Sequence, residues 1–147
     1  MKKILGVIGT FAFLVVATVI GRVIGQAAVE SSQPAPDVEA TLQQVATQIN
    51  GQLPRMLDQE TRMDEARSGP GKTLTYFYTL TSYDSREVDH QNAQTAIEPG
   101  VRQRECNSSK MRVLFKSGVT AQFVYRGNDG GEITSFAISP ADCGIVP

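Results

Sequence analysis

The sequence predicts an α+β protein in which an N-terminal transmembrane helix precedes a small antiparallel sheet of four to five strands, packed by one or two helices. Three observations predict this fold class. An apolar run fills residues 4–20, a helical stripe of apolar residues follows residue 37, and segments that alternate apolar and polar residues occupy much of the remainder. We therefore expect a signal anchor at residues 1–29, a linker at 30–36 and a periplasmic domain at 37–147.

The apolar run follows Lys2 and Lys3, and such charges stay on the inner side of the membrane. Seventeen residues span roughly 25 Å as a helix, slightly less than a hydrocarbon core of about 30 Å. The run continues past Arg22, whose long side chain can reach the headgroups. We therefore expect an uncleaved single-pass anchor in a bacterial inner membrane. Cleavage near residues 25–27, which would leave a secreted or periplasmic protein, is the alternative.

Two further features of composition bear on partners. Gly21 and Gly25 have the spacing of a close helix contact, which allows a weak homodimer in the membrane. The exported part carries 11 basic residues against 15 acidic ones, a net charge of −4, and contains no basic run. A nucleic-acid partner is therefore not expected.

The first elements of the exported domain are a helix and two strands. Asp37 is the expected N-cap of a helix whose apolar stripe is formed by Val38, Leu42, Val45, Ile49 and Leu53, and Gly51 and Pro54 should end it. Strands are expected at residues 60–67 and 73–81, around a turn at 68–71. In the second strand, Leu74, Tyr76, Tyr78 and Leu80 should face the core, and the threonines should face solvent.

The second half is predicted to hold one more helix and a meander. A capping residue at Asp84 or Ser85 precedes a helix that passes Ile97 and stops at Pro99 and Gly100. Three antiparallel strands are then expected at residues 111–116, 119–126 and 132–139, with turns at 117–118 and 127–131.

The two cysteines, Cys106 and Cys143, both lie in the exported part. In an oxidising compartment an even cysteine count indicates first a disulfide. A metal site or a nucleophilic cysteine is less favoured, because His90 is the only histidine and stands at no ligand spacing from either cysteine.

No pattern in the chain reaches a catalytic signature. Asp89 and His90 lack a nucleophile motif, and the turn at residues 127–131 fails the calcium-loop pattern. Acidic residues at 58, 60, 64 and 65 alternate with arginines, which is typical of a solvated, ion-paired surface. We therefore expect no catalytic residue, no metal and no cofactor.

Several segments together resemble a family of small bacterial envelope proteins with an N-terminal membrane helix and a two-cysteine α+β periplasmic domain. They are LPRMLDQETRMDEARSGPGKTLTYFYTL, the Cys106 segment, MRVLFKSGVTAQFVYRGNDG and SPADC. The resemblance implies a bacterial envelope protein and supports the disulfide. It implies no reaction, substrate or catalytic residue.

These observations favour a membrane-tethered module that binds a protein or another envelope component, and that is not an enzyme. The candidate interaction surface consists of Arg55, Glu60, Arg62, Asp64, Arg67, Gly69, Pro70 and Lys72. One alternative is an inhibitor or immunity-type protein that inserts residues 68–72 into an envelope-acting toxin or lytic enzyme. A less favoured one is an envelope hydrolase that uses the carboxylates of residues 58–65 and would need a concave site around them.

Overall fold

A computed structural model of the chain describes residues 37–147. The predicted membrane helix, the linker and the pair Gly21 and Gly25 lie outside the described residues. Within residues 37–147, no helix is both long enough and apolar enough to cross a membrane.

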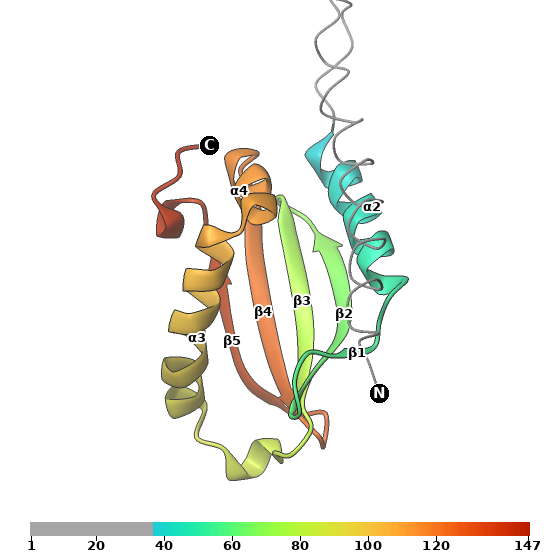
Figure 1. The fold of residues 1–147 in the computed structure, drawn as a ribbon, viewed down its shortest axis with the longest axis vertical. Coiled ribbons are helices and arrows are strands. Elements are labelled where there is room, and N and C mark those ends of the chain that lie inside the picture. The colour runs from blue at the N-terminus through green and yellow to red at the C-terminus, as the bar shows by residue number, and fades with distance from the viewer. Residues whose placement is uncertain (1–36) are drawn as a thin grey trace, which may run out of the picture. The chain divides into compact units, whose positions relative to one another are not determined.

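The described part is built on a five-stranded mixed sheet (Figure 1). Its strands are β1 (Arg55–Met56), β2 (Thr61–Gly69), β3 (Thr73–Leu80), β4 (Thr120–Gly127) and β5 (Glu132–Ile138), and they lie in sequence order across the sheet. All neighbouring strands are antiparallel except β3 and β4, which are parallel.

Three α-helices pack on one face of this sheet: α2 (Val38–Asn50), α3 (His90–Asn107) and α4 (Ser109–Lys116). Short 3₁₀ turns, η1 (Ser85–Glu87) and η2 (Ala141–Cys143), precede α3 and follow β5. The core lies between the helices and the sheet and includes Leu42, Val101, Phe115, Phe123 and Ile138. The α+β class is therefore confirmed, with a mixed sheet in place of the predicted antiparallel one and three packed helices in place of the predicted one or two.

Aromatic side chains form the floor of this core. Phe123 stacks against Tyr76 at 5.4 Å and against Phe136 at 5.6 Å between ring centroids. The Tyr76 hydroxyl reaches the Met111 sulfur at 3.7 Å, and burial raises the pKa of this tyrosine. The predicted core face of β3 is thus confirmed.

Helix α2 follows its sequence signals closely. The Asp37 side chain accepts a hydrogen bond from the Glu39 amide, as an N-cap residue does, and Gly51 is the C-cap. Leu42 and Ala46 are fully or almost fully buried, and Val45 and Ile49 pack beside them. Leu53, which was expected on the same stripe, lies beyond the helix end.

The predicted strand at residues 111–116 is wrong, because this segment forms α4. The Ser108 side chain accepts a hydrogen bond from the Met111 amide and caps the helix. Met111 and Phe115, four residues apart, then point into the core together. The fifth strand is instead the two-residue β1, which no sequence pattern indicated.

The predicted end of the preceding helix is also wrong, since α3 continues through Pro99 and Gly100 to Asn107. Its 18 residues cover about 27 Å, close to the roughly 26 Å of an eight-residue strand. Together α3 and α4 return the chain to the end of the sheet where β3 begins. This return makes β3 and β4 parallel and replaces the predicted meander.

The expected pairing of Cys106 with Cys143 is present and joins the end of α3 to η2, with the two Cα atoms 5.2 Å apart. The strands predicted at residues 119–126 and 132–139 are confirmed within a residue at each end.

Candidate protein-binding surface

The face of the sheet opposite the helices is covered by none of the helices in residues 37–147, since the sheet residues of the core cluster point to the other side. We call it the open face. From β2 to β5 it presents the side chains of Arg62, Asp64, Glu65, Arg67, Thr75, Phe77, Thr79, Gln122, Val124, Arg126, Ser135 and Ala137.

Two arginines flank a phenylalanine at the centre of the open face. The Arg67 guanidinium on β2 lies 4.9 Å from the centroid of the Phe77 ring, and the Arg126 guanidinium on β4 lies 4.7 Å from it. The strand order places β3 between β2 and β4, so one ring receives a cation from each neighbouring strand. Such cation–π contacts hold long side chains flat on the sheet while the charges remain near solvent.

Acidic side chains balance part of this charge. A register shift between Met63 and Glu65 turns both Asp64 and Glu65 onto the open face. Asp64 Oδ1 accepts from Arg62 Nε at 2.5 Å, and Asp64 Oδ2 accepts from the Thr79 hydroxyl at the same distance.

Glu65 is held in a similar way. It accepts two hydrogen bonds from Arg67, at 2.6 and 2.7 Å, and these bonds lower the pKa of its carboxyl group. Because these pairs are partly exposed and screened by solvent, each contributes little to stability. Their effect is to orient the side chains of the surface.

The structure brings together only part of the predicted interaction surface. Arg62, Asp64 and Arg67 share the open face. Arg55 pairs with Met63, so it points to the core side, and Glu60 lies in the β1–β2 turn. The other three residues, Gly69, Pro70 and Lys72, lie at the β2–β3 turn at the end of the sheet.

Phe77 and Arg126 were missed by the sequence reasoning. A signal for Phe77 was present, because it is the single aromatic residue on the threonine face of β3. Arg126 gave no such signal. Its place beside Phe77 depends on the parallel pairing of β3 and β4.

The β2–β3 turn is fastened to two helical segments. The Gly71 amide donates to Glu39 of α2 at 3.0 Å, and the Lys72 ammonium group donates to the Ser117 carbonyl after α4 at 3.4 Å. The Thr120 amide also donates to the Lys72 carbonyl at 3.0 Å. Residues 68–72 therefore do not form a projecting loop of the kind that inserts into a partner's cleft.

Three of the four carboxylates proposed for a hydrolase, those of Asp58, Asp64 and Glu65, have a local contact. Asp58 accepts hydrogen bonds from the amides of Glu60 and Thr61, which lower the pKa of its carboxyl group. Asp64 and Glu65 are held by arginines, as described above. No group of three or more His, Cys, Asp or Glu side chains in residues 37–147 is placed to hold a metal ion.

Asp129 has a structural contact in the β4–β5 turn. Its carboxylate accepts from the Ser85 amide at 3.0 Å and from the Ser85 hydroxyl at 2.7 Å, so it joins this turn to η1. His90 is the first residue of α3, directly after the N-cap Asp89.

The outer edge of β2 is closed by one side chain of α2. The Asn50 amide group donates to the Ala66 carbonyl at 2.8 Å and accepts from the Ala66 amide at 2.7 Å. This pair of bonds replaces a neighbouring strand beyond the short β1. A groove between α2 and β2 borders the contact and is lined in part by Gln43, Thr47 and Glu65.

Comparison with solved structures shows a shared fold. A Pseudomonas aeruginosa protein described as a putative secreted protein superposes with a TM-score of 0.63 at 11% identity, over 72% of this chain and 92% of that one. The type II secretion pilotin EpsS of Vibrio vulnificus superposes with a TM-score of 0.58 at 13% identity, over 72% of this chain and 91% of that one. The type II secretion pilotin AspS of Vibrio cholerae superposes with a TM-score of 0.53 at 15% identity, over 72% of this chain and 92% of that one. No family model and no curated protein sequence matches the chain.

Proposed function

We propose that this chain is a bacterial envelope protein that binds another protein through its open face and that it catalyses no reaction. The observation that carries the proposal is the Arg67–Phe77–Arg126 cluster on the sheet face that no helix in residues 37–147 covers. Aromatic and arginine side chains are enriched at protein interfaces, where each supplies a large contact area. The two guanidinium groups favour a partner segment that carries carboxylates.

The fold likeness supports a binding role in the envelope. Two of the similar structures are pilotins of type II secretion systems and a third is described as a putative secreted protein. By analogy, this chain works on the exported side of the bacterial inner membrane and contacts a component of an envelope assembly. Its apolar N-terminal run either keeps it there as a single-pass tether or, if cleaved, releases it into the periplasm.

Two rival functions have less support. The inhibitor hypothesis relied on residues 68–72 as an inserting loop, and this turn is tied to α2 and α4. The hydrolase hypothesis relied on carboxylates that gather in a concave site, whereas Asp58, Asp64 and Glu65 are each engaged in separate local bonds.

Site-specific crosslinking in intact cells tests the proposal. A photoreactive residue at Thr75 or Gln122, both on the open face, should capture one protein, and the same residue at Gln91, at the start of α3, should not. Capture should fail when Arg67→Ala and Arg126→Ala are combined in a chain that remains folded. Capture that is equal at Gln91, or that the double substitution leaves unchanged, would contradict the assignment.

A further inference from the structure

One end of the domain concentrates positive charge. It is formed by the start of α2, the β2–β3 turn and α4, which the contacts of Gly71 with Glu39 and of Lys72 with Ser117 hold together (Figure 1). We call it the basic end and define it by Lys72, Lys110, Arg112 and Lys116. The sequence between Glu105 and Asp129 contains no acidic residue, so α4 brings no charge of opposite sign.

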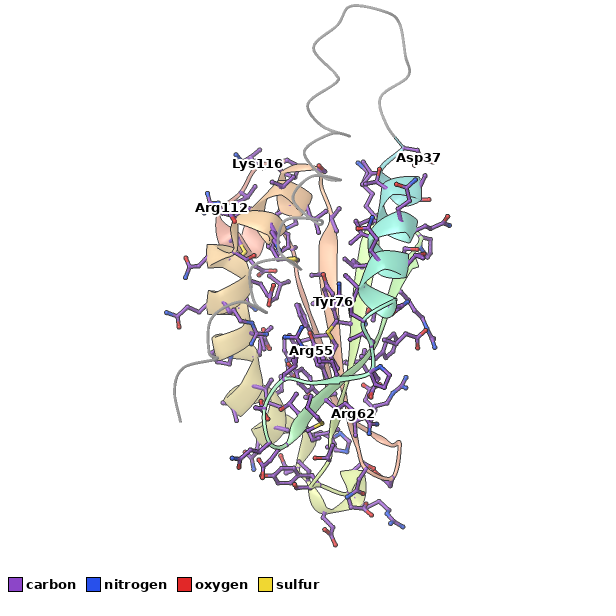
Figure 2. All side chains as sticks on the ribbon, turned by 45° about the vertical axis from the view of Figure 1, so that its right-hand side comes forward. Asp37, Arg55, Arg62, Tyr76, Arg112 and Lys116 are labelled. Carbon is purple, nitrogen blue, oxygen red and sulfur yellow. A yellow bond between two sulfur atoms is a disulfide. The ribbon has the colours of Figure 1, made fainter. Side chains whose placement is uncertain are left out.

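Helix α4 is amphipathic in a way that suits a charged surface. Met111 and Phe115 are buried, whereas Arg112 and Lys116 are exposed on the outer side together with Val113, which is 41% exposed. Figure 2 shows Arg112 and Lys116 at the same end of the molecule as Asp37 and far from Arg55 and Arg62.

The carboxylates of Asp37 and Glu39 at this end form no ion pair with Lys72, Arg112 or Lys116. Asp37 accepts from the Glu39 amide, and Glu39 accepts from the Gly71 amide. Among residues 37–147, the ion pairs of the structure include none with Lys72, Arg112 or Lys116. Lys110 has an interaction of its own within the structure.

The opposite end of the domain is acidic. The β1–β2 turn, η1 and the β4–β5 turn meet there, as the contacts of Glu60 with Thr81 and of Asp129 with Ser85 show. The acidic residues at this end are Asp58, Glu60, Asp84, Glu87, Asp89, Asp129 and Glu132. The basic residues Arg62, Arg86 and Arg126 lie among them, so the end keeps a net negative charge. The charges of the domain are therefore separated along its length.

The described chain begins at the basic end. Asp37 is the N-cap of α2, and the predicted linker before it has only seven residues, 30–36, which span at most about 25 Å. A membrane that holds residues 1–29 would therefore lie within that distance of the start of α2. Anionic headgroups attract basic residues near the surface and repel carboxylates.

We propose that the basic end rests on the anionic phospholipid surface of the membrane, so that the acidic end points away from it. This inference rests on the membrane tether of the proposed function. Arg112 and Lys116 contact lipid phosphates, Lys72 lies beside them, and Val113 faces the headgroup region. Each basic residue near the surface should favour the docked orientation about fivefold.

The experiment uses the full chain reconstituted in lipid nanodiscs that contain a headgroup-attached fluorescence quencher. One fluorophore is attached through Ser109→Cys in α4 and, in a separate sample, another through Ser82→Cys at the acidic end, with the native cysteines kept oxidised. In discs with 30% phosphatidylglycerol, the probe at residue 109 should be quenched and the probe at residue 82 should not. Quenching should be lost in pure phosphatidylcholine discs.

Charge substitutions give the decisive comparison. Combining Arg112→Gln and Lys116→Gln should lower the ratio of docked to undocked molecules about 25-fold. The control combines Gln91→Glu and Asn92→Asp in the first turn of α3, which changes net charge by the same amount on exposed residues elsewhere and should leave quenching unchanged.

Two results would overturn the inference. One is equal quenching of the probe at residue 109 in anionic and neutral discs, and the other is a loss of quenching in the control variant equal to that in the Arg112→Gln and Lys116→Gln variant. A chain that inserts into the discs but shows no quenching at residue 109 refutes the lipid contact and leaves the tether intact. A chain that does not associate with the discs at all refutes the tether itself, and with it the lipid contact.

Discussion

Replacing Asn50 by alanine tests how the outer edge of β2 is closed. Asn50 is the last residue of α2, and its side-chain amide makes two hydrogen bonds with the backbone of Ala66, at 2.7 and 2.8 Å. Alanine cannot make either bond. Because β1 covers only the start of β2, no strand in residues 37–147 takes the place of the lost partner.

The expected loss of stability follows from these two bonds. A buried backbone group left without a partner costs about 1–3 kcal/mol, and the lower end of this range applies because the site is only part-buried and water can enter. The better helix propensity of alanine offsets at most about 0.7 kcal/mol. With about 1 kcal/mol for each of the two Ala66 groups, less this offset, we expect Asn50→Ala to lower the free energy of unfolding by about 1.5 kcal/mol, equivalent to roughly 6 °C in Tm for a domain of this size.

Urea unfolding of the full chain in mild detergent, followed by tyrosine fluorescence, measures this change, since the chain has four tyrosines and no tryptophan. Asn50→Asp keeps the acceptor for the Ala66 amide but loses the donor, and should fall between wild type and Asn50→Ala. Thr47→Ala, one turn earlier on α2, should change stability by less than about 0.5 kcal/mol. If Asn50→Ala unfolds within that margin of the wild type, Asn50 does not close the edge.

Three further predictions concern stability. Replacing Cys106 and Cys143 by serine should cost about 4 kcal/mol in urea unfolding, because the bridge closes a separation of 37 residues, and dithiothreitol should have no further effect on this variant. Hydrogen bonds from Ser139, then from Arg102, lower the pKa of Asp142 to about 2. The stability that Asp142 contributes is therefore present above pH 4 and is lost as the pH falls towards 2. In an acid titration, the free energy of unfolding should decline less steeply in Asp142→Asn than in the wild type. In Gly127→Ala the new Cβ would overlap Asp129 Oδ1 and lie 2.6 Å from the Ser85 nitrogen, so Tm should fall markedly. In Gly100→Ala the new Cβ would meet no atom within 4 Å outside its own stretch of α3, so Tm should be unchanged or raised. A Gly127→Ala variant as stable as wild type would show that the β4–β5 turn and η1 are not closely packed.

The sequence predicted local elements well where only one periodicity fits. The threonine alternation of β3 and the stripe of α2 each have one interpretation, and both were confirmed. Residues 111–116 allow two interpretations. Met111, Val113 and Phe115 alternate as in a strand, whereas Met111 and Phe115 also have helical spacing. The Ser108 cap and the packing of both side chains into the core decide for the helix.

The candidate surface was predicted only in part, because local sequence patterns do not show which strands become neighbours. The charges of β2 are visible in the sequence, so Arg62, Asp64 and Arg67 could be chosen from it. Their meeting with Phe77 and Arg126 depends on the register shift in β2 and on the parallel pairing of β3 with β4. Both features join segments far apart along the chain.

By itself, the sequence determined the α+β class, the cysteine pair, the start of α2 and the core face of β3, because hydrophobic period, capping residues and cysteine count act locally or without regard to topology. It also predicts the apolar N-terminal anchor. Only the tertiary structure decided that α3 and α4 carry the chain back to make β3 and β4 parallel. It likewise decided that Asn50 closes the edge of β2, and that the positive and negative charges gather at opposite ends of the domain. These features depend on which segments become neighbours, and that is set by the packing of the whole core.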